Sequence, residues 1–310
     1  MFPGTVRYLV THVRPHWDEI VAIWLLVRFG NRQFPDINKA IVVFWDGGPQ
    51  VEVLGVTRPL TEIRPFSLFV GTGGGPLDEH IAEGRLEDSC AATLTAKFLG
   101  IQNNPALRQI LSYTLNNDTK GGAGAFELPI VLRTKGLPAK EAFRLGFVVL
   151  DALFQEQKHF HEVVVPFFKK NSRVVIARDK FLVLAISGED EALAKAARYC
   201  SPNHVMLIQV TSRGANIFVN SKSEHRISLA GLVQEIRKAE AFKAGRPFPP
   251  KEKIAREGKI PECPEWYFHC LNGGLGGALL NDPASHRGAS PPTRLSEADI
   301  VRCIKADFRL

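Results

Sequence analysis

Two histidines and two carboxylates lie close together near the start of the chain. The stretch from His12 to Glu19 reads H-V-R-P-H-W-D-E, so that His12, His16 and Asp18 fall within seven residues. Imidazole and carboxylate groups are ligands for Mn, Zn and Fe. These three side chains are therefore candidate metal ligands. The alternative is that the histidines serve a turn and a helix start, where Asp18 and Glu19 favour the positive end of the helix dipole.

A predicted strand and a predicted helix position these groups. Residues 6–10 form an apolar, partly β-branched run that is typical of a buried strand. From Asp18 onward the apolar residues recur at helical spacing: Ile20, Val21, Ile23, Trp24 and Val27. Pro15 fixes the bend between the two elements. Because ligands bind at the carboxyl ends of strands in open α/β sheets, we expect chemistry at this turn.

A second polar turn follows a short predicted strand. Residues 67–70 predict the strand, and after it come the glycine-rich run 71–75 and then Asp78, Glu79 and His80. The glycine run fits neither G-x-G-x-x-G at a helix start nor the phosphate-binding loop, which requires a Lys. We interpret it as a flexible bend that lets the backbone approach a site.

Two other predicted elements also lead into carboxylates. Residues 40–45 predict a buried strand that ends at Asp46, in the strong turn signal D-G-G-P. Residues 105–115 predict a helix, and this helix leads into the polar loop N-N-D-T-K-G-G, which contains Asp118. Both segments place polar side chains at the end of an element.

The composition indicates a soluble globular protein. The chain has 310 residues, of which 45% are hydrophobic and 23% are charged. No apolar run reaches the ~20 residues that a membrane span requires, and the N-terminus lacks the pattern of a signal peptide, so we expect a cytoplasmic protein. The net charge of +7 favours polyanionic partners such as nucleotides or nucleic acid. Solubility alone would also explain a charge of this size.

The cysteines indicate reduced thiols. They are odd in number and scattered, and none forms a C-x-x-C pair: Cys90, Cys200, Cys263, Cys270 and Cys303. This pattern argues against a disulfide framework and against a zinc ribbon.

The order of the predicted elements divides the chain near residue 170. Through residues 1–170 strands alternate with helices, which favours an α/β fold with a mainly parallel sheet flanked by helices. Residues 139–170 are largely helical. From residue 171 the order strand, strand, helix, strand, strand, helix predicts a smaller α+β domain over residues 171–310. Residues 245–264 are rich in Pro, Lys and Arg and are interpreted as an irregular surface segment.

The first turn resembles a known motif. H-V-R-P-H-W-D-E is similar to the first motif of the DHH phosphoesterase superfamily, His-x-x-Pro-Asp-x-Asp, with His16 where the first Asp stands. That substitution, and the Glu19 that follows Asp18, resemble the melanocyte-proliferating-gene exonuclease family within the superfamily. Members of this family are metal-dependent hydrolases.

Three later segments resemble the other motifs of the superfamily in the same order. D-E-H at 78–80 resembles the D-H-H signature, and S-C-A-A at 89–92 resembles the Ser-Ser-Ala segment that follows it. N-D-T-K-G-G at 117–122 resembles the Asp-Thr-Gly-Gly motif that closes the metal site. The resemblance covers residues 6–128 well and the rest loosely. It implies a DHH-like metal-binding catalytic domain over residues 1–170 and a substrate-binding domain over residues 171–310.

The chain departs from the family pattern at two positions. In the family, the strand before the D-H-H signature ends in an Asp that bridges two metals, and the matching residue here is Gly71. The middle His of the signature is replaced by Glu79. Asp46, at the end of the neighbouring predicted strand, is a candidate for the missing oxygen ligand. A simple turn role for Asp46 is the alternative.

The resemblance implies hydrolysis of a phosphoester by a metal-activated water. The expected ligands of the divalent metal are His12, His16, Asp18, Asp46, Glu79 and Asp118. Mn is the expected metal, with Mg, Zn or Fe as alternatives. His80 and Asp78 are the expected catalytic residues. His80 would bind the scissile phosphate or assist proton transfer to the leaving oxygen.

Five residues are candidates for substrate binding. Arg14 and Arg213 are chosen because phosphate oxygens pair well with Arg. His269, Gly273 and Gly274 lie in a segment that resembles the Gly-Gly-Gly-His motif of the superfamily, although no His follows the glycines. A glycine turn between two elements is the alternative for this segment.

The expected partner is a phosphate-containing substrate such as RNA, an oligonucleotide or a nucleotide. Two alternatives stay open. One is a non-catalytic nucleotide or nucleic-acid binding protein on the same fold, which Gly71 and Glu79 favour, and the other is a phosphoanhydride hydrolase. No membrane partner is expected, and a homodimer is one option for the assembly.

Overall fold

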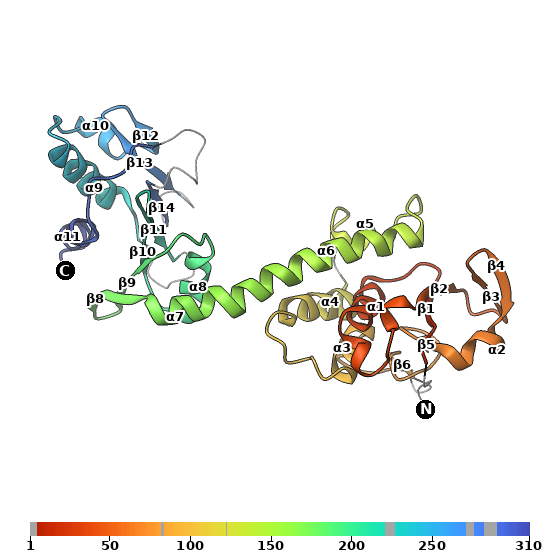
Figure 1. Cartoon of the computed structure of the whole chain (residues 1–310). Helices are drawn as coiled ribbons and strands as arrows, with labels where there is room; N and C mark the ends of the chain where they lie inside the picture. The colour runs from red at the N-terminus through yellow and green to blue at the C-terminus, as the bar shows by residue number, and fades with distance from the viewer. Residues whose placement is uncertain (1–4, 82–83, 122, 221–226, 271–275, 282–289) are drawn as a thin grey trace. The chain divides into compact units, whose positions relative to one another are not determined.

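The chain forms two compact units, which we describe separately. The computed structural model describes residues 5–81, 84–121, 123–220, 227–270, 276–281 and 290–310. The first unit is Met1–His159 and the second is Phe160–Leu310 (Figure 1). Each unit contains its own sheet and its own buried apolar clusters. The expected α/β class is confirmed, with a parallel sheet in the first unit and a larger mixed sheet in the second.

The sheet of the first unit has three parallel strands. β1 (Tyr8–His12) lies between β2 (Ile41–Trp45) and β5 (Ser67–Phe69). Tyr8 pairs with Ile41 on one side and with Ser67 on the other. The carboxyl ends of all three strands therefore meet at one edge of the sheet. The turn that holds His12 and His16 begins at this edge.

Helices cover one face of this sheet. α1 (Trp17–Phe29) packs against α3 (Ala91–Phe98), α4 (Arg108–Lys120) and α6 (Ala139–His159). Every residue of α1 from 17 to 26 is buried, so this helix is a core element on all its sides. Its close packing against α6 requires Gly146, because a Cβ atom there would lie 2.7 Å from Cγ2 of Ile20.

A β-hairpin and a short helix cover the other face. The hairpin consists of β3 (Gln50–Val53) and β4 (Val56–Pro59), and α2 (Leu60–Ile63) follows it. Val10 of β1 belongs to the same buried cluster as Val53 and Ile63. The expectation of helices as the main cover of both faces was therefore wrong for this face. The hairpin was not predicted from the sequence.

α4 is longer than expected and changes the setting of one predicted site residue. The sequence predicted a helix over 105–115 followed by a polar loop, whereas α4 extends to Lys120. Asp118 consequently lies in the last turn of a helix. Two short strands, β6 (His80–Ile81) and β7 (Gly84–Arg85), pair with each other before α3. The one-turn helix α5 (Leu128–Val131) lies between α4 and α6.

The second unit is built on a seven-stranded mixed sheet. Its strand order is β12-β13-β14-β11-β10-β9-β8, and β9 and β10 are parallel while the other neighbours are antiparallel. The strand bounds are β8 Arg173–Arg178, β9 Phe181–Ser187, β10 Met206–Val210, β11 Ala215–Val219, β12 Gly258–Ile260, β13 Cys263–Cys270 and β14 Gly277–Leu280. The predicted order of strands and helices from residue 171 to 242 agrees with β8, β9, α8, β10, β11 and α9.

Helices of the second unit include α7 (Val165–Asn171), which follows a π-helical turn at Phe160–Val164. The others are α8 (Leu193–Cys200), α9 (Ala230–Lys243), α10 (Lys251–Ile254) and α11 (Glu297–Phe308). The segment 245–264, which we expected to be irregular, contains both α10 and β12. Its order depends on Arg237, whose fully buried guanidinium donates to the carbonyls of Ile254, Arg256, Gly258 and Trp266. Within the described ranges, no helix combines the length and apolar character that a membrane crossing requires.

Candidate functional site

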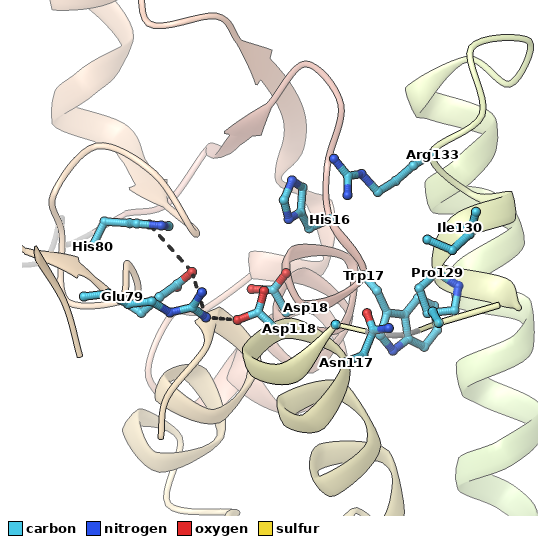
Figure 2. A pocket seen from close by; sticks show the side chains of 13 residues that line it. His16, Trp17, Asp18, Glu79, His80, Asn117, Asp118, Pro129, Ile130 and Arg133 are labelled. Atoms are coloured by element: carbon cyan, nitrogen blue, oxygen red, sulfur yellow. Dashed lines mark hydrogen bonds and ion pairs between the residues drawn. The ribbon is translucent and has the colours of Figure 1, made fainter. Parts of the chain in front are cut away.

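A cavity of about 340 Å³ opens beside the first turn of α1. Four parts of the first unit line it: the start of α1, the D-E-H segment with β7, the end of α4, and the segment around α5 (Figure 2). Its charged and titratable lining residues are His16, Asp18, Glu79, His80, Arg85, Asp118 and Arg133. Carboxylates that are distant in the sequence therefore meet in one hollow of the surface.

Three ligand-capable side chains converge in this cavity. One atom each of His16, Asp18 and Asp118 can be chosen so that all three atoms lie within 4.8 Å of one another. His16 immediately precedes α1, and Asp18 is its second residue. Asp118 comes from the last turn of α4, and its side chain lies close to Asp18 in Figure 2. The fold thus brings together residues that are a hundred positions apart.

Asp18 is the most buried member of this group. Its side chain is only 3% exposed, and its Oδ2 atom accepts a hydrogen bond of 3.2 Å from the backbone N–H of Ala91 at the start of α3. Burial, together with the nearby charges of Glu19 and Glu79, raises the pKa of Asp18 to about 7. Such a group is stabilised in its ionised form when a cation lies beside it.

His16 has the opposite electrostatic setting. Desolvation of its ring lowers its pKa, and the positive charge of Arg133 lowers it further. A neutral imidazole has a free nitrogen lone pair, which is the form that binds a metal. His16 therefore has the protonation state that a ligand requires at neutral pH.

Glu19 holds the turn together. Its buried carboxylate accepts hydrogen bonds from Oγ1 of Thr11 at 2.9 Å and from the backbone N–H of His16 at 2.6 Å. Nδ1 of His12 lies 2.6 Å from Oε1 of the same carboxylate. This hydrogen bond is the main cause that raises the pKa of His12. His12 is thus bound to Glu19 and does not belong to the group formed by His16, Asp18 and Asp118.

Glu19 also occupies the space beside Gly71. The backbone of Gly71 has φ of +65°, and a Cβ atom there would lie 2.7 Å from Cγ of Glu19. A carboxylate from α1 thus fills the place where a side chain at position 71 would begin.

The D-E-H segment forms a second cluster. Asp78 accepts hydrogen bonds from the backbone N–H of Gly74 at 2.8 Å and of His80 at 3.0 Å, and its Oδ1 lies 3.0 Å from Nδ1 of His80. Ligand-capable atoms of Asp78, Glu79 and His80 also lie within 4.8 Å of one another. Asp78 therefore fixes the orientation of the half-exposed His80 ring and leaves its Nε2 atom directed away from the carboxylate.

Two arginines of the cavity were missed in the sequence. Arg85 in β7 forms an ion pair with Asp118 and lies 3.9 Å from Oε1 of Glu79. Arg133 follows α5 and lines the cavity on the side of His16. No spacing rule distinguishes these residues from the other 37 basic residues of the chain, which has 39 Lys and Arg in total. Only their position in the folded unit identifies them.

Asp46 and Arg14, both predicted in the first unit, lie elsewhere. Asp46 is exposed, and its Oδ1 accepts the backbone N–H of Gly48 at 2.9 Å, so it closes its own turn as the alternative interpretation proposed. Asp46 is not among the residues that line the cavity, and it does not belong to the group formed by His16, Asp18 and Asp118. Arg14 is exposed and does not line the cavity.

The remaining predicted residues belong to the second unit. Arg213 is exposed between β10 and β11, and Nδ1 of His269 on β13 lies 3.6 Å from Glu257. Gly273 and Gly274 lie outside the described residues.

The donor set of the cavity fits a divalent cation. It offers one imidazole and two carboxylates at mutual distances that small side-chain adjustments bring into one coordination sphere, and this mixture suits Mn, Zn or Fe. Within the described part of the chain, Oε2 of the buried Glu79 has no hydrogen-bond partner. A buried carboxylate oxygen without a donor is costly unless a cation or water satisfies it.

The comparisons with known proteins add little to this geometry. No family model matches the sequence, and no curated protein matches it. One similar solved structure is described as the DHH domain of a member of a family of ribosomal proteins; it is 9% identical, and the alignment covers 98% of this chain and 87% of that chain. The TM-score is 0.28, which is below the level at which two folds are considered the same.

Proposed function

We propose that the chain is a metal-dependent phosphoesterase whose active site is the cavity beside α1. The observation that carries the proposal is the convergence of His16, Asp18 and Asp118 within 4.8 Å. The order of the D-E-H and N-D-T-K-G-G segments, which resembles the DHH superfamily, supports it. The expected substrate is a phosphodiester in RNA, an oligonucleotide or a nucleotide, and Mn is the expected metal.

The residues of the cavity would have separate roles in hydrolysis. His16, Asp18 and Asp118 would hold the cation, with Glu79 beside them. When bound, a divalent cation would supply positive charge for the phosphate oxygens and would lower the pKa of a water, so that it loses a proton near neutral pH and can attack phosphorus as hydroxide. Asp78 holds the His80 ring through Nδ1, so Nε2 of His80 would give a proton to the leaving oxygen.

One observation favours a second function, which is binding without catalysis. The guanidinium of Arg85 pairs with Asp118 and approaches Glu79, so a fixed positive charge already lies among the carboxylates. A protein that kept this ion pair permanently would leave Asp118 unavailable to a metal, so that any nucleotide it binds would be bound without one. The two functions differ in whether Mn²⁺ binds at Asp118.

Metal binding and turnover test the first proposal together. Isothermal titration of the metal-free protein with Mn²⁺ should give one saturable site, and Asp18→Asn or Asp118→Asn should weaken it by on the order of 100-fold, because each substitution removes a charged ligand. Hydrolysis of bis(p-nitrophenyl) phosphate with Mn²⁺ should fall in the same variants. Asp46→Asn is the matched control, since it removes a carboxylate that closes an exposed turn.

Two results would decide against hydrolysis. If the wild-type chain takes up no Mn²⁺, or if both cavity variants bind it as tightly as the wild type, the metal-dependent mechanism fails. Metal-independent binding of a nucleotide by the wild type, without turnover, would then favour the binding function.

A further inference from the structure

The cavity has two chemically different sides. Asp18, Glu79 and Asp118 form its acidic side, with Arg85 paired to them. The opposite side is formed by Trp17, Pro129 and Ile130, with the guanidinium of Arg133 at its margin (Figure 2). A ligand that fills the cavity therefore contacts carboxylates at one end and an apolar surface with a cation at the other.

Arg133 differs from Arg85 in its partners. The guanidinium of Arg85 forms an ion pair with the carboxylate of Asp118. The side chain of Arg133 is exposed and, among the described residues, has no ion pair or hydrogen bond. Its positive charge acts on the imidazole of His16, which also lines the cavity. A guanidinium without a carboxylate partner at the margin of a cavity is free to bind an anion, and its planar fork matches two oxygens of a phosphate.

The segment that carries Arg133 is held in place. Leu132, the preceding residue, is buried in the core of the first unit. Glu127 precedes α5 and accepts hydrogen bonds from the hydroxyl of Tyr113 on α4 at 2.9 Å and from the backbone N–H of Gly124 at 3.1 Å. The backbone N–H of Arg133 donates to the carbonyl of Ile130 at 3.1 Å. This anchoring reduces the entropy cost of ordering the segment around a ligand.

The apolar side of the cavity indicates what the phosphate is attached to. Trp17 lines this side, and its indole N–H is buried, so it offers no donor to a ligand. Pro129 and Ile130 add only carbon surface. A volume of about 340 Å³ is at the lower end of the range for small-molecule sites. An inorganic anion would leave this surface uncovered, whereas an organic group would cover it.

We propose that Arg133 binds the phosphate of an organic phosphate ester and that Trp17, Pro129 and Ile130 contact the organic group which carries it. This inference rests on the proposed function and deepens it, because it favours a nucleotide-like ester over pyrophosphate as the ligand of the same site. Arg133 is then a substrate-binding residue, and Ile130 contributes to the choice of substrate.

Binding of adenosine monophosphate, inorganic phosphate and pyrophosphate tests the inference. Each is titrated into the full chain by calorimetry, with and without Mn²⁺, at one pH and one salt concentration. Arg133→Ala should weaken binding of phosphate and of adenosine monophosphate by about 10-fold or more, as expected for the loss of a charge-assisted hydrogen bond. Ile130→Ala should weaken only adenosine monophosphate, by about 3-fold to 10-fold. Lys135→Ala is the matched control, because it removes an exposed positive charge two residues away.

The outcomes separate this inference from the proposed function. Equal small losses in Arg133→Ala and Lys135→Ala would overturn it, and so would tighter binding of pyrophosphate than of adenosine monophosphate. If adenosine monophosphate binds through Arg133 while Mn²⁺ does not bind, the inference stands and the hydrolase proposal fails. If Mn²⁺ binds through Asp18 and Asp118 but no adenosine monophosphate binds, the inference fails and the metal site stands.

Discussion

The carboxylate arm of Glu19 occupies the space that a side chain on Gly71 would need. A Cβ atom on Gly71 would lie 2.7 Å from Cγ of Glu19 and 2.8 Å from its Oε1. The same carboxylate forms hydrogen bonds with the side chains of Thr11 and His12 and with the backbone N–H of His16. A residue at position 71 and the conformation of the turn before α1 are therefore coupled.

The first prediction tests this coupling. Gly71→Ala should destabilise the protein by about 2–4 kcal/mol, because it adds a clash to the cost of a positive φ. Gly74→Ala is the control: Gly74 has φ of +68° but nothing within 4 Å of a Cβ atom, so it should cost only about 1–2 kcal/mol. Urea unfolding of both variants measures the difference. Equal losses of stability in the two variants would show that the side chain of Glu19 moves away from an added methyl group without a measurable cost.

The second prediction concerns the pH dependence of the metal-free protein. The pKa of Asp18 is raised from 3.8 to about 7, so across that window the native state keeps a proton that the unfolded chain releases. The contribution of Asp18 to stability is fully present below about pH 4 and is lost as the pH rises through 7. Asp18→Asn has no proton to lose, so its free energy of unfolding should not fall in this pH range. Between pH 5 and pH 8 it should exceed that of the wild type by on the order of 2–3 kcal/mol. Denaturant unfolding with a chelator present measures it, and parallel profiles for the two proteins would contradict it.

The third prediction concerns the ion pair between Arg85 and Asp118. A cation that binds Asp118 must displace the guanidinium of Arg85. Arg85→Ala should therefore raise the affinity for Mn²⁺ by about 2-fold to 10-fold, which corresponds to a partly exposed ion pair. Calorimetric titration against Arg14→Ala, which removes an exposed arginine outside the cavity, provides the comparison. Weaker Mn²⁺ binding in Arg85→Ala would show that Arg85 supports the metal site.

The fourth prediction concerns Arg237 in the second unit. Its buried guanidinium donates to four carbonyls that belong to α10, β12, β13 and the turn between α10 and β12. Arg237→Lys supplies one ammonium in place of the planar fork, so several of these carbonyls lose their donor, at a cost of about 3 kcal/mol or more. Lys238→Arg is the control on the exposed side of the same helix. Thermal unfolding that is unchanged by Arg237→Lys would contradict this role.

Local patterns in the sequence were sufficient for much of the fold. The apolar run before His12 and the helical spacing after Asp18 predicted β1 and α1, because both elements are buried along their length. The hairpin at 50–59 was missed because only Val51 and Val53 of its first strand face the core. α4 was ended too early, since Asn and Asp have weak helix propensity although tertiary packing extends the helix to Lys120.

Less of the candidate site than of the fold could be predicted from the sequence. The turn before α1 and the segment around Asp118 were identified by their residue types, and the fold brings His16, Asp18 and Asp118 together. The hydrogen bond between His12 and Glu19 was not predictable, because it depends on side-chain direction within the turn. Arg85 and Arg133 were missed because only tertiary structure decides which cations have a carboxylate partner.

The burial of residues 17–26 of α1 makes the two sides of the cavity differ in how well they tolerate substitution. Asp18 lies at the start of a helix whose residues 17–26 are all in the core, so a side chain of a different size there would disturb the packing. Ile130 and Arg133 are exposed, and substitutions there leave the core intact. Directed evolution of ligand preference would therefore find its tolerated mutations in the α5 segment, while the carboxylates on the other side remained fixed.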